Sequence, residues 1–326
     1  MIQRGIVVLL LGFLPVAGFA GAPKAQPQDA VGWLNLMAEA SGRTAFSGTY
    51  VHQIGGRMES SRITHAVDSS GEYEKLVSLD GPAREVIRRN DDIVCYLPAA
   101  KVMKYDRKRG RRYFPGLVGN VSGLLESYTP KLGQVDRVAG FDCQWVMLEP
   151  KDALRFAHRF CAELASGLLL RAVIVTDKME VLEQFGFTQI AISPQITPDQ
   201  IKSDYAHNKG TWQADNSALQ DAPKWDSGWS VKSLPSGFKK VWEAKRTMSG
   251  KPEPVVHQVY TDGLASVSVF IEPPANNPSP VSGLARQDNY NFFFRSLPDH
   301  GITVIGEVPQ AALQLIGNSL TAPPPR

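Results

Sequence analysis

The sequence is poor in the motifs that mark enzymes and metal-binding proteins. Its 326 residues contain no Gly-x-Ser-x-Gly elbow, no glycine-rich phosphate loop, and neither a His-Glu-x-x-His nor a Cys-x-x-Cys motif. A hydrolase would need a nucleophile beside His158 or His65, and the sequence indicates none. The six histidines are scattered, without the spacing of metal ligands: His52, His65, His158, His207, His257 and His300. We therefore expect no catalytic residue, no metal site and no cofactor.

Strong net charge and long apolar runs are also lacking. The net charge of +3 is too small to indicate a polyanionic partner. Charged residues make up 21% of the chain and hydrophobic residues 43%, which is the composition of ordinary globular domains. Beyond residue 22 no segment is long and apolar enough to cross a bilayer. The length is sufficient for two domains with hydrophobic cores of their own.

The first twenty residues have the pattern of a signal peptide. Arg4 supplies positive charge, residues 6–14 are apolar, and residues 18–20 (Gly-Phe-Ala) offer the small side chains that a signal peptidase recognises. We predict cleavage after Ala20 and a soluble mature protein outside the cytoplasm, where nucleic acid is not a partner. The alternative is a retained membrane anchor. No cysteine lies near the cleavage point, which excludes a bacterial lipoprotein.

The first domain, residues 21–206, is predicted to be mainly β. A helix from Ala30 to Ala40 has Asp29 as its N-cap and Gly42 as its end. Short strands separated by turn residues then predict an antiparallel meander that curls into an unclosed barrel, with the helix on its concave side and an apolar groove. The predicted strands are 45–53, 58–67, 72–79, 85–89, 93–97 and 102–105.

A linker and a smaller domain follow. Polar and small residues dominate residues 207–226, which we interpret as the linker. We expect the tryptophans in and after it, Trp212, Trp225 and Trp229, to pack between the domains, and the alternative is direct contact with a partner. Residues 227–320 predict an α+β domain with a helix that begins at Pro309, and residues 321–326 a disordered tail. The strands of this domain are predicted at 239–245, 255–260, 265–271, 290–295 and 302–308.

Several segments carry a resemblance to a known family. The run from Asp80 to Asn90 (DGPAREVIRRN) is the most specific, and four shorter segments follow it in order: Leu182–Phe185, Leu234–Phe238, Tyr260–Leu264 and Val304–Pro309. With these segments the chain resembles the RseB/MucB family of periplasmic regulators. The resemblance implies an N-terminal domain similar to the lipoprotein carriers LolA and LolB.

The resemblance also implies a function. A member of this family would bind the periplasmic region of an RseA/MucA-like anti-sigma factor and protect it from regulated proteolysis. Lipopolysaccharide or lipoprotein acyl chains would release it. For contact with the partner, Arg84 and Arg88 are our candidates. The alternative from another class is a carrier of lipids or lipoproteins that uses the groove of the half-barrel.

One segment allows two interpretations. From Asp152 to Leu164 the apolar residues have a helical period, whereas the family resemblance favours a strand, which we adopt. A hairpin that turns near Asp152 would place Cys143 directly opposite Cys161, close enough for a disulfide in an oxidising compartment. The alternative is that all three cysteines, including Cys95, are reduced residues of the core.

One dense group of positive charge lies between residues 101 and 112. Such a run is commonly a solvated hairpin tip. The functional alternative is an anion site for lipid phosphates or for an acidic partner, because guanidinium groups bind phosphate in a bidentate manner. Next to it, residues 115–125 are interpreted as a mobile, partly apolar loop that gates the groove. The candidate anion-binding residues are Lys101, Lys104, Arg107, Lys108, Arg109, Arg111 and Arg112.

Overall fold

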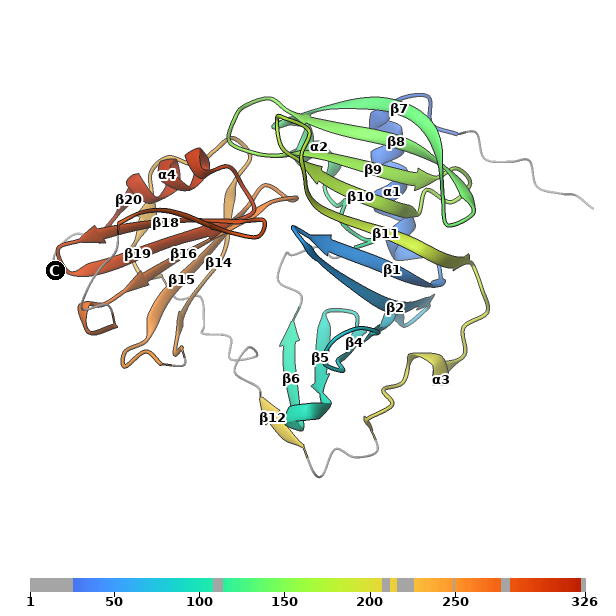
Figure 1. Cartoon of the computed structure of the whole chain (residues 1–326), viewed down its shortest axis with the longest axis horizontal. Coiled ribbons are helices and arrows are strands. Elements are labelled where there is room, and N and C mark those ends of the chain that lie inside the picture. Colours follow the sequence, from blue (N-terminus) through green and yellow to red (C-terminus); the bar gives the residue numbers. More distant parts are fainter. Residues whose placement is uncertain are drawn as a thin grey trace, which may run out of the picture.

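The computed structural model describes most of the chain as two β-rich domains, shown in Figure 1. The predicted signal peptide lies outside the described residues, as does most of the predicted linker. The described residues are 26–107, 114–206, 212–215, 226–248, 250–276 and 282–323.

The first domain is one sheet of twelve strands whose two ends do not pair with each other among the described residues. All neighbouring strands are antiparallel except β12, which pairs parallel with β6. The predicted unclosed antiparallel barrel is thus confirmed. The strands in order of pairing are β12 (Gln213–Asp215), β6 (Val102–Arg107), β5 (Asp92–Leu97), β4 (Glu85–Arg89), β3 (Gly71–Ser78), β2 (Arg57–Asp68), β1 (Phe46–Ile54), β11 (Val181–Ile192), β10 (Leu169–Val175), β9 (Ala157–Glu163), β8 (Phe141–Pro150) and β7 (Tyr128–Val138).

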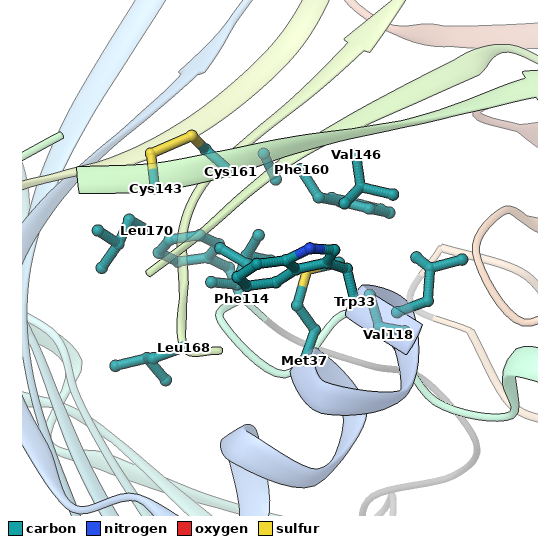
Figure 2. Close-up of a cluster of buried hydrophobic side chains, with 14 of the residues drawn as sticks. Trp33, Met37, Phe114, Val118, Cys143, Val146, Phe160, Cys161, Leu168 and Leu170 are labelled. Carbon is teal, nitrogen blue, oxygen red and sulfur yellow. A yellow bond between two sulfur atoms is a disulfide. The ribbon is translucent and has the colours of Figure 1, made fainter. Parts of the chain in front are cut away.

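Helix α1 (Ala30–Arg43) packs on this sheet through one apolar face. The Asp29 carboxylate accepts a hydrogen bond from the Gly32 amide at 2.7 Å, as expected of an N-cap. The helix continues past Gly42, so the predicted end was wrong. Trp33 and Met37 are buried against side chains of the sheet such as Phe160 (Figure 2).

The concave side next to α1 is filled by the chain itself. After β6 the chain returns through Phe114, whose ring stacks on Phe185 at a centroid distance of 5.3 Å, and enters the short helix α2 (Val121–Leu125). Val118, Val121 and Leu124 are buried in the same core. The interpretation of residues 115–125 as a mobile loop was therefore wrong, because their apolar side chains occupy the interior instead of facing solvent.

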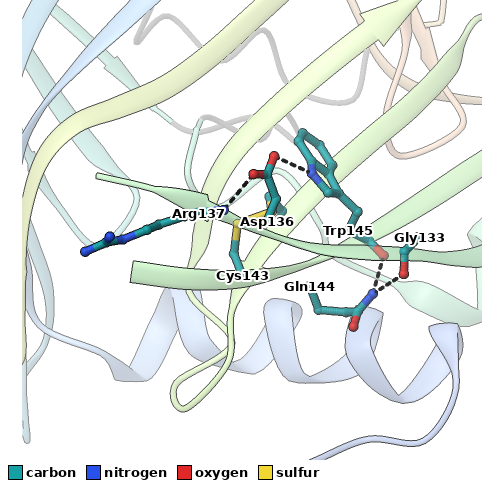
Figure 3. The surroundings of a disulfide bond; sticks show 7 residues. Gly133, Asp136, Arg137, Cys143, Gln144 and Trp145 are labelled. Carbon is teal, nitrogen blue, oxygen red and sulfur yellow. Dashed lines mark hydrogen bonds between the residues drawn. A yellow bond between two sulfur atoms is a disulfide. The ribbon is translucent and has the colours of Figure 1, made fainter. Parts of the chain in front are cut away.

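The segment that allowed two interpretations is a strand. Strands β8 and β9 form the predicted hairpin, and a disulfide joins Cys143 to Cys161 with their Cα atoms 5.3 Å apart. The register differs from our expectation, because Cys143 lies opposite Glu163 and Cys161 opposite Trp145. The half-cystines are thus diagonal neighbours. Beside them, the Trp145 indole donates a hydrogen bond to Asp136 at 3.0 Å, which ties β8 to the edge strand β7 (Figure 3).

The second domain is a sheet of six antiparallel strands with a helix on one face (Figure 1). Helix α4 (Gln310–Asn318) packs on β18 and β19 through Leu313 and Ile316. The sheet order is β14 (Lys239–Arg246), β15 (Val255–Thr261), β16 (Ser266–Glu272), β19 (His300–Gly306), β18 (Tyr290–Leu297) and β17 (Gly283–Gln287).

Several short elements complete the chain. In the first domain these are the 3-10 turn η1 (Pro98–Ala100) and helix α3 (Pro198–Ile201), and in the second the 3-10 turn η4 (Pro274–Asn276). Strand β13 (Ser230–Val231) pairs with β20 (Leu320–Thr321). The predicted disordered tail therefore began too early, because Thr321 is opposite Ser230, while residues 324–326 lie outside the described residues.

The linker is anchored to the first domain. Residues 213–215 form β12 on the outer edge of β6, and Trp212 lies against Tyr96 and Tyr205 at centroid distances of 5.7 and 5.3 Å. Trp229 is buried in the core of the second domain. The expectation that these tryptophans pack between the domains was therefore wrong, and Trp225 lies outside the described residues.

Candidate functional site

Two of the candidate cations lie on the concave face of the half-barrel. Strands β4, β5 and β6 align Val86, Cys95 and Lys104 in one row, and Arg84, which directly precedes β4, is close enough for its charge to act on the Cys95 thiol. Arg84 and Lys104 are exposed, and Cys95 between them is free and half-buried. Burial raises the pKa of the Cys95 thiol, and the charges of Arg84 and Lys104 oppose that rise. This row therefore presents the positive charges of Arg84 and Lys104 beside the half-buried side chains of Val86 and Cys95.

Arg88, the second candidate for partner contact, is engaged within the sheet. Its guanidinium pairs with Glu72 at 2.9 Å and with Glu74 at 3.1 Å, and its side chain is 11% exposed. Its charge is thereby neutralised inside the first domain. Arg84 is the more accessible of the two candidates.

The basic run is described only in part. Lys101 adopts a left-handed backbone conformation after η1, and Lys104 points to the concave face as described above. Arg107 ends strand β6. The remaining four candidates, Lys108, Arg109, Arg111 and Arg112, lie outside the described residues.

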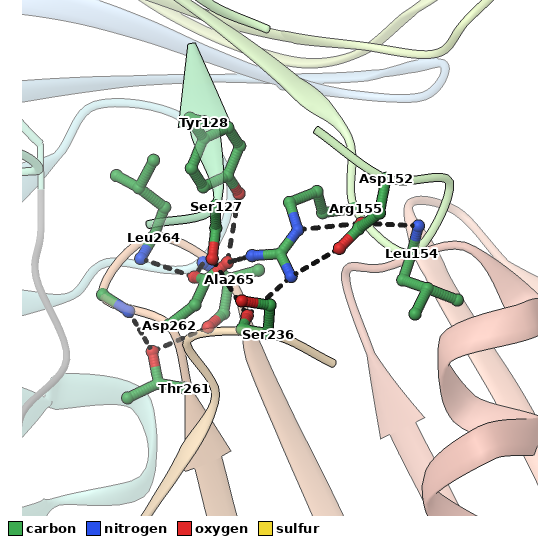
Figure 4. A network of polar contacts seen from close by, with 11 residues as sticks. Ser127, Tyr128, Asp152, Leu154, Arg155, Ser236, Thr261, Asp262, Leu264 and Ala265 are labelled. Atoms are coloured by element: carbon green, nitrogen blue, oxygen red, sulfur yellow. Dashed lines mark hydrogen bonds and ion pairs between the residues drawn. The ribbon is translucent and has the colours of Figure 1, made fainter. Parts of the chain in front are cut away.

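The domains meet at a buried ion pair that the sequence analysis did not identify. Arg155, in the turn between β8 and β9, extends to the turn between β15 and β16 and pairs with Asp262 at 2.8 Å (Figure 4). The two side chains are 0% and 1% exposed. Arg155 also donates to the Ser236 carbonyl at 2.7 Å, and Asp152 holds it from the first-domain side at 3.0 Å.

Further groups of both domains complete this contact. The Tyr128 hydroxyl donates to Asp262 Oδ2 at 3.2 Å, the same oxygen that Arg155 binds. Burial, and secondarily the Asp262 charge, raises the pKa of the Tyr128 hydroxyl well above its usual value. The Ser127 hydroxyl donates to the Ser236 carbonyl at 3.0 Å. A buried charge with this many partners is costly to leave unpaired, so the contact specifies one arrangement of the domains.

A second polar contact joins the domains at β11. Glu183 is buried, accepts a hydrogen bond from Asn289 of the second domain at 2.5 Å, and lies 2.8 Å from the His52 ring. Near it, Arg57 pairs with Asp288 at 3.2 Å. Two separated contacts restrict rotation of one domain against the other more than a single contact does.

His158 lies behind these contacts on the inner face of β9. Its ring meets the Tyr128 ring edge-on at a centroid distance of 5.8 Å. Burial lowers the pKa of His158 to about 4, and the charges of Asp262 and Glu183 act in the opposite direction. The ring is therefore neutral at neutral pH, which suits a core histidine.

The described residues show no grouping of side chains suited to metal binding. No three of their histidines, cysteines and carboxylates are arranged to hold a metal ion. Within the same residues no helix is long and apolar enough to cross a membrane.

Comparisons with known proteins identify the two domains separately. The family model of the MucB/RseB N-terminal domain matches residues 29–205, and that of the MucB/RseB C-terminal domain matches residues 223–321. The chain belongs to the MucB/RseB family. The resemblance that the sequence motifs carried is thereby confirmed.

Individual members of the MucB/RseB family match over most of their length. The chain is 30% identical to the sigma factor AlgU regulatory protein MucB of Pseudomonas aeruginosa, with 96% of each chain covered. It is 23% identical to the sigma-E factor regulatory protein RseB of Escherichia coli K12, with 81% of each chain covered. These relatives are regulatory proteins by name.

Solved MucB structures share the two-domain architecture. A chain of the Pseudomonas aeruginosa MucA/MucB complex matches with a TM-score of 0.74 and 27% identity, covering 91% of this chain and 99% of that one. The crystal structure of MucB matches with a TM-score of 0.65 and 26% identity, covering 90% and 98%. The mainly β fold with a smaller second domain is therefore shared with MucB.

The family motifs contained the junction residues. Glu183, Ser236 and Asp262 each lie in a segment that supported the family resemblance. Sequence alone did not show that these segments meet, because 79 residues separate Glu183 from Asp262, and Arg155 lies in a region whose secondary structure was ambiguous. The motifs were thus a usable signal for the junction, although they did not indicate its geometry.

Proposed function

We propose that the protein is a periplasmic regulator of an envelope-stress sigma factor. It binds the periplasmic region of a MucA/RseA-like anti-sigma factor and protects that region from regulated proteolysis. The observation that carries the proposal is the match to a sigma factor regulatory protein through both domains, at 30% identity over 96% of each chain. The similarity to the MucA/MucB complex structure supports the choice of partner.

The geometry fits a binding protein. The buried Arg155–Asp262 pair and the Glu183–Asn289 contact hold the domains together, so that a partner segment can contact both without having to order them first. Arg84 and Lys104 offer exposed positive charge for acidic stretches of the partner. A segment held along such a surface is inaccessible to a protease.

Release by a lipid signal is the second part of the proposal. The same cations that face an acidic peptide also suit the phosphates of lipopolysaccharide or another anionic lipid. A lipid bound at Arg84 and Lys104 would therefore compete with the partner. Such competition requires no catalytic step, and the protein acts without enzymatic activity.

The test is a binding measurement with the mature protein. The periplasmic region of the anti-sigma factor from the same organism is immobilised, and affinity is measured with and without lipopolysaccharide. We expect saturable binding that the lipid weakens, and a loss of at least tenfold for the Arg84→Glu/Lys104→Glu variant. The control is Arg43→Glu on α1, where Arg43 forms only an exposed pair with Glu39 among the described residues. Absence of binding, together with recovery of lipoproteins from membrane extracts, would support the carrier instead.

A further inference from the structure

The second domain has a sheet face that is unusually apolar for a surface without a covering layer. Helix α4 covers one face of the six-stranded sheet, and Figure 1 shows no described helix over the other, which we term the open face. An antiparallel sheet covered on one side normally presents polar residues on the other. The open face instead contains a row of apolar and aromatic side chains across five strands: Trp242, His257, Phe270, Ile305, Phe292 and Phe294.

The strand register places these side chains on one surface. Phe270 is opposite Thr303, which is opposite Phe294, while Ile305 is opposite Phe292. Directly opposed residues of neighbouring strands share a face. Phe292 and Phe294 stack with centroids 6.0 Å apart and remain half-buried. Aromatic residues that are half-covered on a sheet surface are typical of a protein contact.

The sheet edges differ in how well they are protected. Native proteins blunt free edges with bulges, proline, lysine or a covering segment. In the first domain, β12 covers β6, and β7 contains Pro130 and a register shift between Leu132 and Val135. In the second domain, β14 has a bulge at Val241 among its lysines.

Among the described residues, strand β17 has no bulge, proline, lysine or covering segment, and its one charged side chain is that of Arg286. All five of its residues are exposed, and its register against β18 is continuous from Gly283 to Gln287. Its outer side therefore offers backbone N–H and C=O groups to an added strand. An extended peptide satisfies these groups, whereas a hydrocarbon chain cannot.

The side chains of β17 leave the aromatic row accessible. Gly283 is opposite Phe294 and Ala285 is opposite Phe292, so the two positions of β17 beside these rings have almost no side chain. The third position on this face, Gln287, is opposite Tyr290. An added strand would lie next to them, and its larger side chains could extend across to the two rings. Affinity would come from the backbone and specificity from these alternate side chains.

The position of β17 also connects to the domain junction. The turn that follows it contains Asp288 and Asn289, which bond to Arg57 and Glu183 of the first domain. A segment that runs along β17 past Gln287 would thus reach the first domain beside Met58, which is 63% exposed. A second copy paired only through this five-residue edge would bury far less than the roughly 1,200–2,000 Å² of a stable interface.

From these observations we propose that β17 accepts an extended segment of the protein partner as a seventh strand, with alternate side chains of that segment on Phe292 and Phe294. The inference rests on the proposed function for the identity of the partner, the periplasmic region of an anti-sigma factor. It deepens that function by naming the edge and the mode of binding.

Disulfide trapping tests the mode directly. In a Cys95→Ser background, Ala285→Cys is combined with single cysteines placed along the partner region. We expect crosslinks at every second partner position, because residues of a strand alternate between faces. The matched control is Val241→Cys on the blunted edge β14, where we expect none. Crosslinks that recur every three to four residues, or that are equally strong at position 241, would overturn strand addition.

Affinity measurements separate this inference from the proposed function. Phe294→Ser is expected to weaken partner binding at least tenfold, with Val135→Ser on β7 as an exposed apolar control in the first domain. Thermal unfolding of each variant identifies any loss of affinity that is due to misfolding. If Phe294→Ser misfolds, the Ala285→Cys crosslinking pattern decides whether the partner adds a strand at β17. If Phe294→Ser leaves partner binding unchanged, and if occupying β17 by a crosslink at position 285 also leaves it unchanged, only the inference is refuted and the proposed function stands. If the wild-type protein binds no anti-sigma region, both the proposed function and the inference are refuted. If position 285 instead forms crosslinks between two copies of this chain, the edge is a dimer contact, and the inference that it binds a partner peptide is refuted.

Discussion

Arg155 offers the strongest test of how the two domains are held together. Its guanidinium is wholly buried and forms bonds to Asp152, Asp262 and the Ser236 carbonyl, between 2.7 and 3.1 Å. Removing one partner of a buried ion pair leaves the other charge uncompensated, which typically costs about 3–5 kcal/mol. We therefore expect Arg155→Met, which keeps the apolar stem, to lower the free energy of unfolding by about that amount.

A double-mutant cycle separates the ion pair from its surroundings. Asp262→Asn places an amide against the guanidinium and should cost a similar amount. The double variant should cost about 2–3 kcal/mol less than the sum, because no buried charge then remains unpaired: Asp152, which also loses Arg155, is 30% exposed. Urea unfolding followed by tryptophan fluorescence reports on both domains, since Trp33 is buried in the first and Trp229 in the second. We expect the single variants to show two separated transitions.

The control for this experiment is an ion pair that is exposed to solvent instead of buried. Arg43 and Glu39 on α1 are 74% and 56% exposed, and such pairs contribute at most about 1 kcal/mol. Arg43→Ala should therefore have almost no effect. If Arg155→Met costs less than about 1 kcal/mol, or if the two substitutions are additive, then the pair does not couple the domains and our account of the junction fails.

Two further predictions concern the first-domain hairpin and acid stability. Replacing Cys143 and Cys161 by serine removes the disulfide, which joins residues 18 apart in sequence, and should lower the free energy of unfolding in urea by about 3 kcal/mol. The same loss in the reduced wild-type protein would assign the effect to the disulfide. An unchanged unfolding midpoint in the serine variant would contradict the prediction. His158 has a pKa of about 4 when folded and an ordinary value of 6.5, so the unfolded chain binds more protons between these values. Stability is thus complete above about pH 6.5 and falls toward pH 4, by about 2 kcal/mol per such histidine between pH 7 and pH 5. His257, whose pKa burial also lowers to about 4, adds a similar amount. His158→Leu should remove about half of the combined loss, and an equal pH dependence in both proteins would show that His158 is not its source.

The core strands were predictable because their sequence carries a burial signal. Strands β1 to β6 lie within a few residues of their predicted bounds, and β4 agrees at both ends. Each of these strands either alternates apolar with polar residues or is bounded by turn residues, and both signals can be recognised in a short stretch of sequence. Helix α1 was also predicted, and it continues to Arg43, three residues past its last buried residue, Ala40.

Three of the four edge strands of the two large sheets were missed for a physical reason, whereas the fourth, β14, was predicted. Strand β7 is mostly exposed, and all residues of β17 are exposed, so neither has an alternating apolar pattern. Strand β12 was assigned to the linker because its three residues are held by pairing with β6 instead of by a hydrophobic face. Edges are also where partners add, so the elements most relevant to binding were the least visible in the sequence.

The junction required information that no local pattern contains. The Asp152 carboxylate accepts from the Leu154 amide at 2.9 Å and from Arg155, which stabilises a turn where the apolar period indicates a helix. Arg155 and Asp262 are 107 residues apart. Only the pairing of β8 with β9 aims Arg155 at the second domain.

The filled interior bears on how a lipid could act as the release signal in the proposed function. Displacing Phe114, Val118, Val121 and Leu124 from the core would expose four apolar side chains at a cost of about 1.5–3 kcal/mol each. An acyl chain of about twelve carbons regains roughly 0.8 kcal/mol for each buried methylene, or about 10 kcal/mol. The two terms nearly balance, so small changes in either decide whether a lipid enters.

Phe114→Ala shifts this balance in a defined direction. The substitution removes the ring that stacks on Phe185, so it should lower the stability of the first domain and reduce the cost of displacement. We therefore expect tighter binding of an acylated lipid by the variant, measured by calorimetry. Phe293→Ala is the control, because Phe293 is buried to a similar degree in the second domain and should leave lipid affinity unchanged. If Phe114→Ala weakens lipid binding or has no effect on it, the lipid does not enter the interior, and the cationic row at Arg84 and Lys104 must act on its headgroup alone.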